Sequence, residues 1–282
     1  MTAKLIQAPQ NSSFRKLQDI ASNAKARREH GLAWIEGERL CTAALDVHSW
    51  VDSSRVIWVI SDRLDPSALM RSIQIPAGRA PIEPEVWLLS EGLFKTLSQI
   101  ESPTGWGLLV PIKESAFDSI QIQSTGMASH WVVADRIQDP GNLGSLMRSA
   151  AAAGIRQMVC LKGTVDPWSP KVLRAAMGAH FVMDLMAGLE SEALIQHSEQ
   201  LGRRLMSTAN QPGAVSIYSA DWSIHNPMAW VFGQEGQGVS ASILSVSQTV
   251  VIPQSEQVES LNVGVAAGIC LFEMVRRTQS AA

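Results

Sequence analysis

The feature that most constrains the fold is the regular alternation in the C-terminal half, where short apolar runs are separated by stretches with helical periodicity. Runs that are apolar throughout indicate strands buried on both faces. Buried strands separated by helices are typical of a parallel sheet covered on both sides. The runs WVVAD, QMVCL, FVMDL, RLMSTA, AWVFG and TVVIP occupy 131–135, 157–161, 181–185, 204–209, 229–233 and 249–253.

The N-terminal third shows the same alternation in shorter elements. Its patterns predict helices over 12–31, 38–49, 65–74 and 91–100, and strands over 32–37, 55–61, 85–90 and 105–112. Together these form a unit of about a hundred residues, the usual size of one domain.

The pattern is lost between the two halves, where the chain turns polar with Gln, Ser and Gly. The sequence therefore predicts an α/β protein with a smaller domain at 1–112, a linker at 113–129 and a larger parallel-sheet domain at 130–282.

The composition favours a cytoplasmic protein. The chain is 46% hydrophobic without an apolar run long enough to cross a bilayer, and its start lacks the apolar core of a secretory signal. Cys41, Cys160 and Cys270 are isolated from one another, which predicts reduced core thiols. No metal-ligand spacing is present, so we expect no metal site.

The net charge of −3 disfavours general coating of nucleic acid. The first thirty residues are locally basic, which indicates either a solvated helix face or a surface for RNA phosphates. The basic residues there are Lys4, Arg15, Lys16, Lys25, Arg27 and Arg28.

Three segments that follow strand ends carry unusual glycine or polar content. The first is DRIQDPGNLGSLMRSAAAAG at 135–154, in which Asn142 is expected to cap a helix that Gly154 closes. The helical projection places Arg148 opposite the apolar stripe. Arg148 is therefore either an ordinary surface arginine or a side chain that reaches into a groove.

The second segment is WVFGQEGQGVS at 230–240. Glycines at Gly233, Gly236 and Gly238 let a ligand approach the backbone closely, and Glu235 is either a solvated turn residue or a positioned acceptor. The glycine order differs from the dinucleotide-binding fingerprint, which argues against a Rossmann-type dehydrogenase.

The third segment, IPQSEQVESLNVGVAAG, spans 252–268. Ser260 is expected to cap the closing helix, with Leu261 and Asn262 at its entrance. Gly264 and Gly268 lie inside that helix, where each costs about 1 kcal/mol relative to Ala, so close approach of another backbone should require them.

In this order, the three segments resemble the signature motifs of the SpoU-type (TrmH-like) RNA 2′-O-ribose methyltransferases of the SPOUT superfamily. The stretch KLQDIASNAKARREHGLAWIEGERLCTAAL is similar to the ribosomal-protein-like RNA substrate-binding domain of that family. The resemblance implies a C-terminal domain tied in a deep trefoil knot, an exception to the usual absence of knots.

The resemblance also implies a cofactor and a reaction. Gly233, Ile252 and Leu261 are expected to contact S-adenosyl-L-methionine, largely through backbone groups. Arg148 is expected to engage the target ribose hydroxyl or the adjacent phosphate and to promote loss of the hydroxyl proton. Completing the expected catalytic set are Asn142, Glu235, Ser260 and Asn262.

Members of this family form homodimers through the closing helix, so a homodimer is expected here. The expected substrate is RNA, with 23S ribosomal RNA favoured over transfer RNA. The alternative from another class is a non-catalytic RNA-binding protein of the same fold, which the joint presence of Arg148, Glu235, Ser260 and Asn262 disfavours.

Overall fold

The computed structural model divides into two compact units. The first unit comprises Met1–Lys113 and Trp168–Phe181, and the second comprises Glu114–Pro167 and Val182–Ala282. The structure describes residues 2–46, 56–73, 85–115, 126–219, 226–255, 257 and 260–280. Most of the predicted linker at 113–129 lies outside these ranges.

The first unit is built on a five-stranded sheet of order β1-β4-β3-β5-β2. Strands β1, β4 and β3 run parallel, and β5 is antiparallel to β3 and β2. The strands are β1 (Thr2–Ile6), β2 (Leu32–Glu36), β3 (Ile57–Ser61), β4 (Glu85–Leu89) and β5 (Trp106–Pro111). The predicted strands agree with β2 to β5, whereas β1 was not predicted.

Two helices replace the single helix that was predicted over 12–31. Helix α1 (Ser12–Ser22) ends at Asn23, whose backbone is extended and whose side chain accepts a hydrogen bond from the Lys25 amide. Asn23 thus caps α2 (Ala24–His30), because a short amide side chain satisfies the free amides at a helix start. Gly31 closes α2 in the left-handed conformation, as the glycine predicted.

The remaining helices of the first unit agree with the predicted segments, with somewhat shorter bounds. Asp65 caps α4 and Pro66 occupies its first turn, as the Asp-Pro pair predicted. Side chains of α1 and α5 share one hydrophobic core with the sheet. These helices are α3 (Glu38–Asp46), α4 (Pro66–Ser72) and α5 (Glu91–Leu97).

A segment from the C-terminal half of the sequence groups with the first unit. It contains α7 (Pro170–Ala176) and the 3₁₀ turn η4 (Ala179–Phe181), and α7 packs against β2. The sequence analysis placed this segment in the C-terminal domain. It also predicted a strand over 181–185, but the structure forms η4 first and starts the strand at Asp184.

The second unit contains a seven-stranded sheet of order β10-β12-β9-β11-β6-β7-β8. Neighbouring strands in this sheet all pair in parallel, which confirms the predicted parallel sheet. Only the two-residue β10 was not predicted. The strands are β6 (Trp131–Asp135), β7 (Gln157–Leu161), β8 (Asp184–Leu189), β9 (Arg204–Thr208), β10 (Val215–Ser216), β11 (Met228–Gly233) and β12 (Gln248–Val251).

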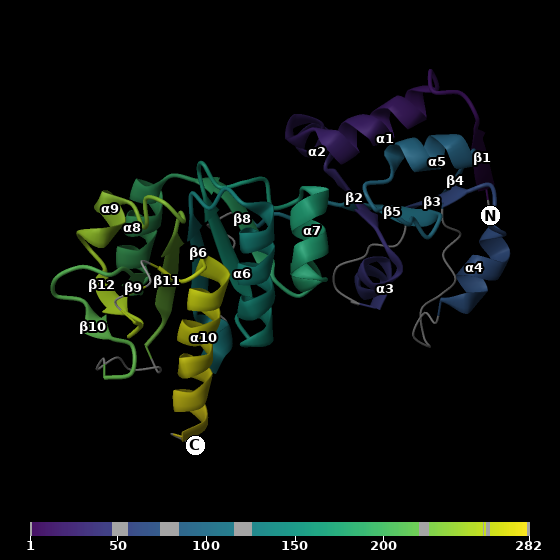
Figure 1. The fold of residues 1–282 in the computed structure, drawn as a ribbon. Helices are drawn as coiled ribbons and strands as arrows, with labels where there is room; N and C mark the ends of the chain where they lie inside the picture. Colours follow the sequence, from purple (N-terminus) through teal and green to yellow (C-terminus); the bar gives the residue numbers. More distant parts are fainter. Residues whose placement is uncertain are drawn as a thin grey trace. The chain divides into compact units, whose positions relative to one another are not determined.

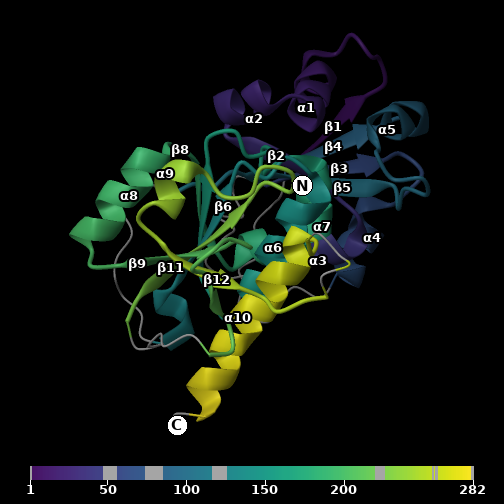
Figure 2. The same cartoon turned by 60° about the vertical axis from the view of Figure 1, so that its left-hand side comes forward.

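Helices cover both faces of this sheet, as Figures 1 and 2 show. Helix α6 packs along α10 on one face, and α8 and α9 contact each other and β9 on the other. The core under α8 and α9 includes Trp131, Val133 and Val231. The helices are α6 (Pro140–Ala152), α8 (Ser191–Gln200), α9 (Ala241–Leu244) and α10 (Val263–Ser280), with the 3₁₀ turn η3 (Gly126–Ser129).

The cysteines are free and buried, as predicted for core thiols. Burial raises the pKa of the thiols of Cys41 and Cys160, and that of Cys270 to about 12, so all three are protonated at neutral pH. Over the described ranges, no helix is long and apolar enough to cross a membrane. In the same ranges, no cluster of His, Cys, Asp or Glu is arranged to hold a metal ion.

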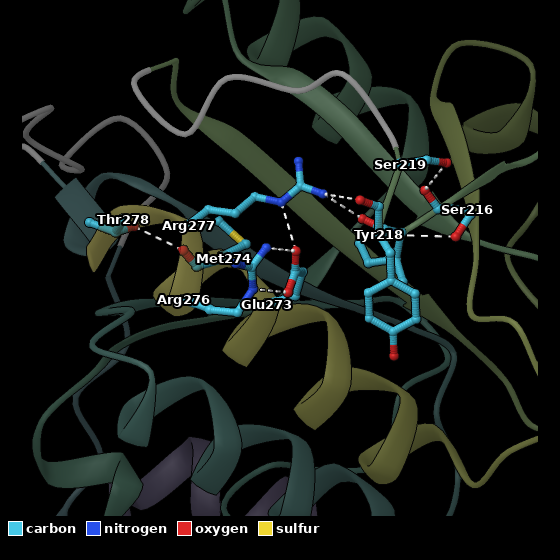
Figure 3. A network of polar contacts seen from close by, with 9 residues as sticks. Ser216, Tyr218, Ser219, Glu273, Met274, Arg276, Arg277 and Thr278 are labelled. Atoms are coloured by element: carbon cyan, nitrogen blue, oxygen red, sulfur yellow. Dashed lines mark hydrogen bonds and ion pairs between the residues drawn. The ribbon is translucent and has the colours of Figure 1, made fainter. Parts of the chain in front are cut away.

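An ionic network fixes the C-terminal part of α10 (Figure 3). The Glu273 carboxylate is 7% exposed and accepts hydrogen bonds of 2.8 Å from both Arg276 and Arg277. Arg277 also donates to the carbonyl oxygens of Ile217 and Tyr218 at 2.9 and 3.1 Å. The helix is therefore tied to the segment that follows β10.

This network should make the stability of the protein depend on pH. The hydrogen bond from Arg276, with that from Arg277, lowers the pKa of the Glu273 carboxyl to about 2, so its stabilisation is complete above the unfolded pKa and is lost as pH falls toward 2. We expect Glu273→Gln to lower the free energy of unfolding at pH 7 by on the order of 1–2 kcal/mol. The difference from wild type should shrink between about pH 4.5 and pH 2.

Denaturant unfolding at several pH values measures this effect. Glu190→Gln is the matched control, because Glu190 pairs with Lys162 on the surface with its side chain 56% exposed. A pH-independent effect of Glu273→Gln would contradict the assignment.

Candidate functional site

A pocket of about 200 Å³ opens in the second unit where the parallel strands β9, β11 and β12 end. This volume far exceeds the ~30 Å³ share of one water molecule, so the pocket admits an organic ligand. In parallel sheets of this kind, ligands bind at the carboxyl ends of the strands. The pocket is lined by Thr208, Ala209, Asn210, Gly233, Gln234, Glu235, Gly238, Val250, Val251, Ile252, Gln254, Ser260, Leu261, Val263 and Ala266.

The pocket brings together residues that the sequence analysis selected from separate segments. Gly233, Ile252 and Leu261, expected to contact the cofactor, all line it. Glu235 and Ser260 from the expected catalytic set line it as well. The other three members of that set lie outside its wall, on α6 and at the start of α10.

One wall of the pocket was not predicted from the sequence; it is formed by Thr208, the last residue of β9, and by Ala209 and Asn210. The available signal was positional. These residues end or directly follow a buried strand whose carboxyl end meets the same edge of the sheet, and Asn-Gln-Pro-Gly there indicates a turn.

The glycine loop, residues 233–240, folds back tightly on itself. A Cβ atom at Gly233 would overlap the carbonyl carbon of Gly238 and the amide nitrogen of Val239. The Gly238 amide donates to the Gln234 carbonyl at 2.8 Å, and Gly238 has a φ of +67°. Only glycine suits these two positions, whereas Gly236 has open space around it.

A chain of side-chain hydrogen bonds joins the three sequence segments. Asn262 Nδ2 donates to Asn142 Oδ1 at 2.7 Å, and Asn142 Nδ2 donates to Glu235 Oε1 at 2.5 Å. We call Asn142, Glu235 and Asn262 the amide relay. It contains three of the five side chains in the expected catalytic set.

The direction of the amide relay is fixed at both ends. Asn262 Oδ1 accepts from the amides of Gly264 and Val265 at 2.9 and 3.3 Å, so its Nδ2 must point toward Asn142. At the other end, an ionised Glu235 can only accept. Asn142 must therefore present its oxygen to Asn262 and its nitrogen to Glu235.

Two expected helix caps were wrong. Helix α6 begins at Pro140, and Asp139 caps it by accepting from the Asn142 amide at 2.8 Å. The sequence expectation gave that role to Asn142, whose side chain instead joins the amide relay. Likewise Asn262, not Ser260, caps α10, because the last non-helical residue accepts from the first free amides.

Arg148 lies on the exposed side of α6, as the helical projection predicted. The opposite side of the helix is buried and includes Leu143, Leu146, Met147 and Ala150. Among the residues that the structure describes, Arg148 has no hydrogen-bond or ion-pair partner. Its guanidinium is therefore available to a ligand.

Gly264 accounts for the close packing of α10 on α6. A Cβ at Gly264 would lie 3.0 Å from Ser145 Cβ and 3.2 Å from Asn262 Oδ1. A Cβ at Gly268 would meet only Ser149 Oγ, at 3.9 Å. The expected close approach is therefore present at Gly264, whereas the packing within this chain does not require Gly268.

Comparisons with known proteins identify a matching family and several similar proteins. Residues 129–272 match the SpoU rRNA Methylase family. An uncharacterised tRNA/rRNA methyltransferase of Synechocystis sp. is 30% identical, over 98% of this chain and 95% of its own. The 23S rRNA (guanosine(2553)-2′-O)-methyltransferase RlmP of Bacillus subtilis is 28% identical, over 96% of this chain and 99% of its own.

The fold comparison agrees with the sequence comparison. The AdoMet-bound rRNA methyltransferase from Sinorhizobium meliloti superposes with a TM-score of 0.80 at 25% identity, covering 98% of each chain. The similarity therefore extends over both units.

The packing at Gly264 generates a matched pair of substitutions. We expect Gly264→Ala to destabilise the protein, since the added methyl crowds Ser145 and the cap of α10. Gly268→Ala should be neutral or stabilising by up to about 1 kcal/mol, because alanine favours the helix and meets no close atom. Denaturant unfolding of both variants checks this, and equal losses would contradict the packing account.

Proposed function

Because this chain belongs to the SpoU rRNA methylase family, we propose that it transfers a methyl group from S-adenosyl-L-methionine to a ribose 2′-hydroxyl of RNA. The family membership confirms the resemblance found in the sequence. The observation that carries the proposal is the pocket, around which the glycine loop and the segment before α10 meet.

The pocket suits the proposed cofactor. Val250, Ile252 and Leu261 give it an apolar side, and Gly233 allows a ligand to approach the backbone closely. These residues would hold the cofactor. When bound, S-adenosyl-L-methionine supplies a methyl group made electrophilic by its sulfonium.

We assign the chemical roles as follows. Arg148 engages the ribose hydroxyl or the adjacent phosphate, and its fixed positive charge favours the alkoxide as the proton leaves. The amide relay holds Glu235 at the pocket wall, and Ser260 lies on that wall. Rate enhancement then comes mainly from aligning the oxygen with the methyl carbon.

We infer that the C-terminal domain is knotted. The order β10-β12-β9-β11-β6 supports this, since β12 pairs beside β9 and the chain then returns to pack α10 on α6. The pocket walls at 208–210, 233–238 and 250–254 meet the start of α10, as expected if the final segment passes through a preceding loop.

We propose that residues 1–112 bind the RNA substrate, that 113–129 link the domains, and that 130–282 perform the transfer. Arg15, Lys25 and Arg28 are exposed on α1 and α2, as RNA docking requires. Arg27 does not belong to this surface. It is 4% exposed and donates to the Ile20 carbonyl at 2.7 Å.

We favour ribosomal RNA, specifically 23S, as the substrate, and hence a cytoplasmic location. The support is that RlmP, which is similar over nearly its whole length, is named for 23S rRNA. Transfer RNA is the alternative. A non-catalytic RNA-binding protein would not bind the cofactor. Calorimetry with S-adenosyl-L-homocysteine therefore distinguishes this alternative from an enzyme.

We also propose a homodimer that forms through α10. Val265 and Phe272 are 53% and 49% exposed, and their spacing of seven places them on one side of the helix, with Ile269 between them. Exposed apolar side chains aligned in this way are typical of an interaction surface.

Methyl transfer from labelled cofactor to separated ribosomal and transfer RNA tests the reaction. We expect label in ribosomal RNA, and a rate at least about a hundredfold lower for Arg148→Ala, because a charge at the reacting oxygen is lost. Binding of S-adenosyl-L-homocysteine should persist, since Arg148 is not among the residues lining the pocket.

Arg204→Ala is the control, since Arg204 is exposed at the opposite, amino end of β9. An undiminished rate for Arg148→Ala would remove Arg148 from catalysis. Label found only in transfer RNA would overturn the choice of substrate.

Sedimentation velocity tests the dimer. We expect wild type to sediment as a dimer and Phe272→Glu as a monomer, because the charge would be buried at the interface. Val246→Glu changes a residue that is 51% exposed away from α10 and should remain dimeric. A monomeric wild type, or identical behaviour of both variants, would refute this interface.

A further inference from the structure

Arg136 combines an unfavourable backbone with an organised side chain. It directly follows β6 and has a φ of +59°. Within the described ranges, Met177 is the only other residue besides glycine with a positive φ. Side chains rarely adopt this conformation, so surrounding contacts must hold it in place.

Contacts on the backbone side hold this conformation. The Arg136 amide donates to Thr164 Oγ1 at 3.1 Å, and the Thr164 hydroxyl donates to the Ala134 carbonyl at 3.0 Å. Gly163 makes room for the side chain, since a Cβ there would lie 3.2 Å from Arg136 Cγ. The turn after β6 is thus shaped to direct the Arg136 side chain.

The Arg136 side chain donates hydrogen bonds to the glycine loop. Its Nη1 donates to Gln237 Oε1 at 3.0 Å, and its Nη2 donates to the Gly238 carbonyl at 3.3 Å. The third donor, Nε, binds Asp135 Oδ1 at 3.0 Å. All three donating nitrogens of the guanidinium therefore have a partner.

Asp135, the acidic partner in this ion pair, also binds the glycine loop. Its carboxylate is buried, with the side chain 2% exposed. While Oδ1 binds Arg136, Oδ2 accepts from the Ser240 amide at 2.6 Å. The buried charge is thus compensated by one guanidinium and one backbone amide, as a stable buried carboxylate requires.

We propose that Asp135 and Arg136 form a clamp that holds the glycine loop in the form that receives the cofactor. This proposal rests on the proposed function, because the loop supplies Gly233, Gln234, Glu235 and Gly238 to the pocket. The clamp contacts the loop at Gln237, Gly238 and Ser240. Arg136 is therefore a positioning residue for cofactor binding.

A surface ion pair that only stabilises the fold would behave differently. Arg136→Gly removes the Arg136 half of the clamp and the unfavourable backbone conformation in one substitution. Relief of the positive φ and loss of the guanidinium beside the buried Asp135 carboxylate act in opposite directions on the thermal midpoint of unfolding, so the clamp proposal is tested by local loosening of the loop. If Arg136 served stability alone, the glycine loop would be affected no more than the core strands.

Hydrogen exchange of the cofactor-free full chain tests the loop directly. We expect faster exchange at Gly238 and Ser240 in Arg136→Gly, with exchange in the core strands unchanged. Met177→Gly is the matched control, since it relieves the other positive φ, at +47°, without touching the glycine loop. Unchanged exchange of residues 233–240 in Arg136→Gly would overturn the clamp.

Calorimetry with S-adenosyl-L-homocysteine supplies the second readout. We expect binding about tenfold weaker for Arg136→Gly, as follows if the competent loop is populated in about a tenth of molecules. Met177→Gly should bind as wild type does. Wild-type affinity in Arg136→Gly would refute the role in binding, whereas a wild type that binds no cofactor would refute the proposed function and leave the exchange result standing.

Discussion

The site depends on the hydrogen bonds that connect Glu235, Asn142 and Asn262. Each residue comes from a different segment, and the connection has one allowed direction because helix amides fix one end and a carboxylate fixes the other. The Asn262 side chain therefore caps α10 through its oxygen and, through its nitrogen, orients the Asn142 amide on α6 and with it the carboxylate of Glu235. The start of α10 and the pocket wall are organised as one structure.

Close backbone approach is the second requirement, and it occurs at two places. Gly233 lets the glycine loop return against its own start, and Gly264 lets α10 approach Ser145 on α6. Both positions exclude a side chain for steric reasons. At each position, the conformational cost of a glycine is offset by contacts that bring distant segments to the pocket.

Features of the fold that follow from hydrophobic periodicity and from the positions of strand ends were predicted from the sequence. The parallel sheet, most elements and the exposed side of α6 were predicted in this way. The gathering of Gly233, Ile252 and Leu261 at one pocket followed from the family resemblance. The two helix caps were not predicted, because several polar residues near each helix start can cap it. Which one does so depends on the tertiary partner of its neighbour, as the engagement of Asn142 with Glu235 shows.

Other features could not be read from local pattern. The break at Asn23 lies inside a continuous helical periodicity, and β1 and β10 are defined by the strands they pair with. The grouping of α7 with the first unit depends on long-range packing against β2. Arg136 carried no signal, because an arginine after a strand does not reveal a positive φ or a grip on a loop a hundred residues later.

The most direct measurement of the central claim is a crystal structure of the full chain grown with S-adenosyl-L-homocysteine. We expect this ligand to bind between Gly233, Ile252 and Leu261, with the hydrogen bonds from Asn262 through Asn142 to Glu235 intact. A ligand bound elsewhere, with side chains closing the pocket beside Gly233, would contradict it.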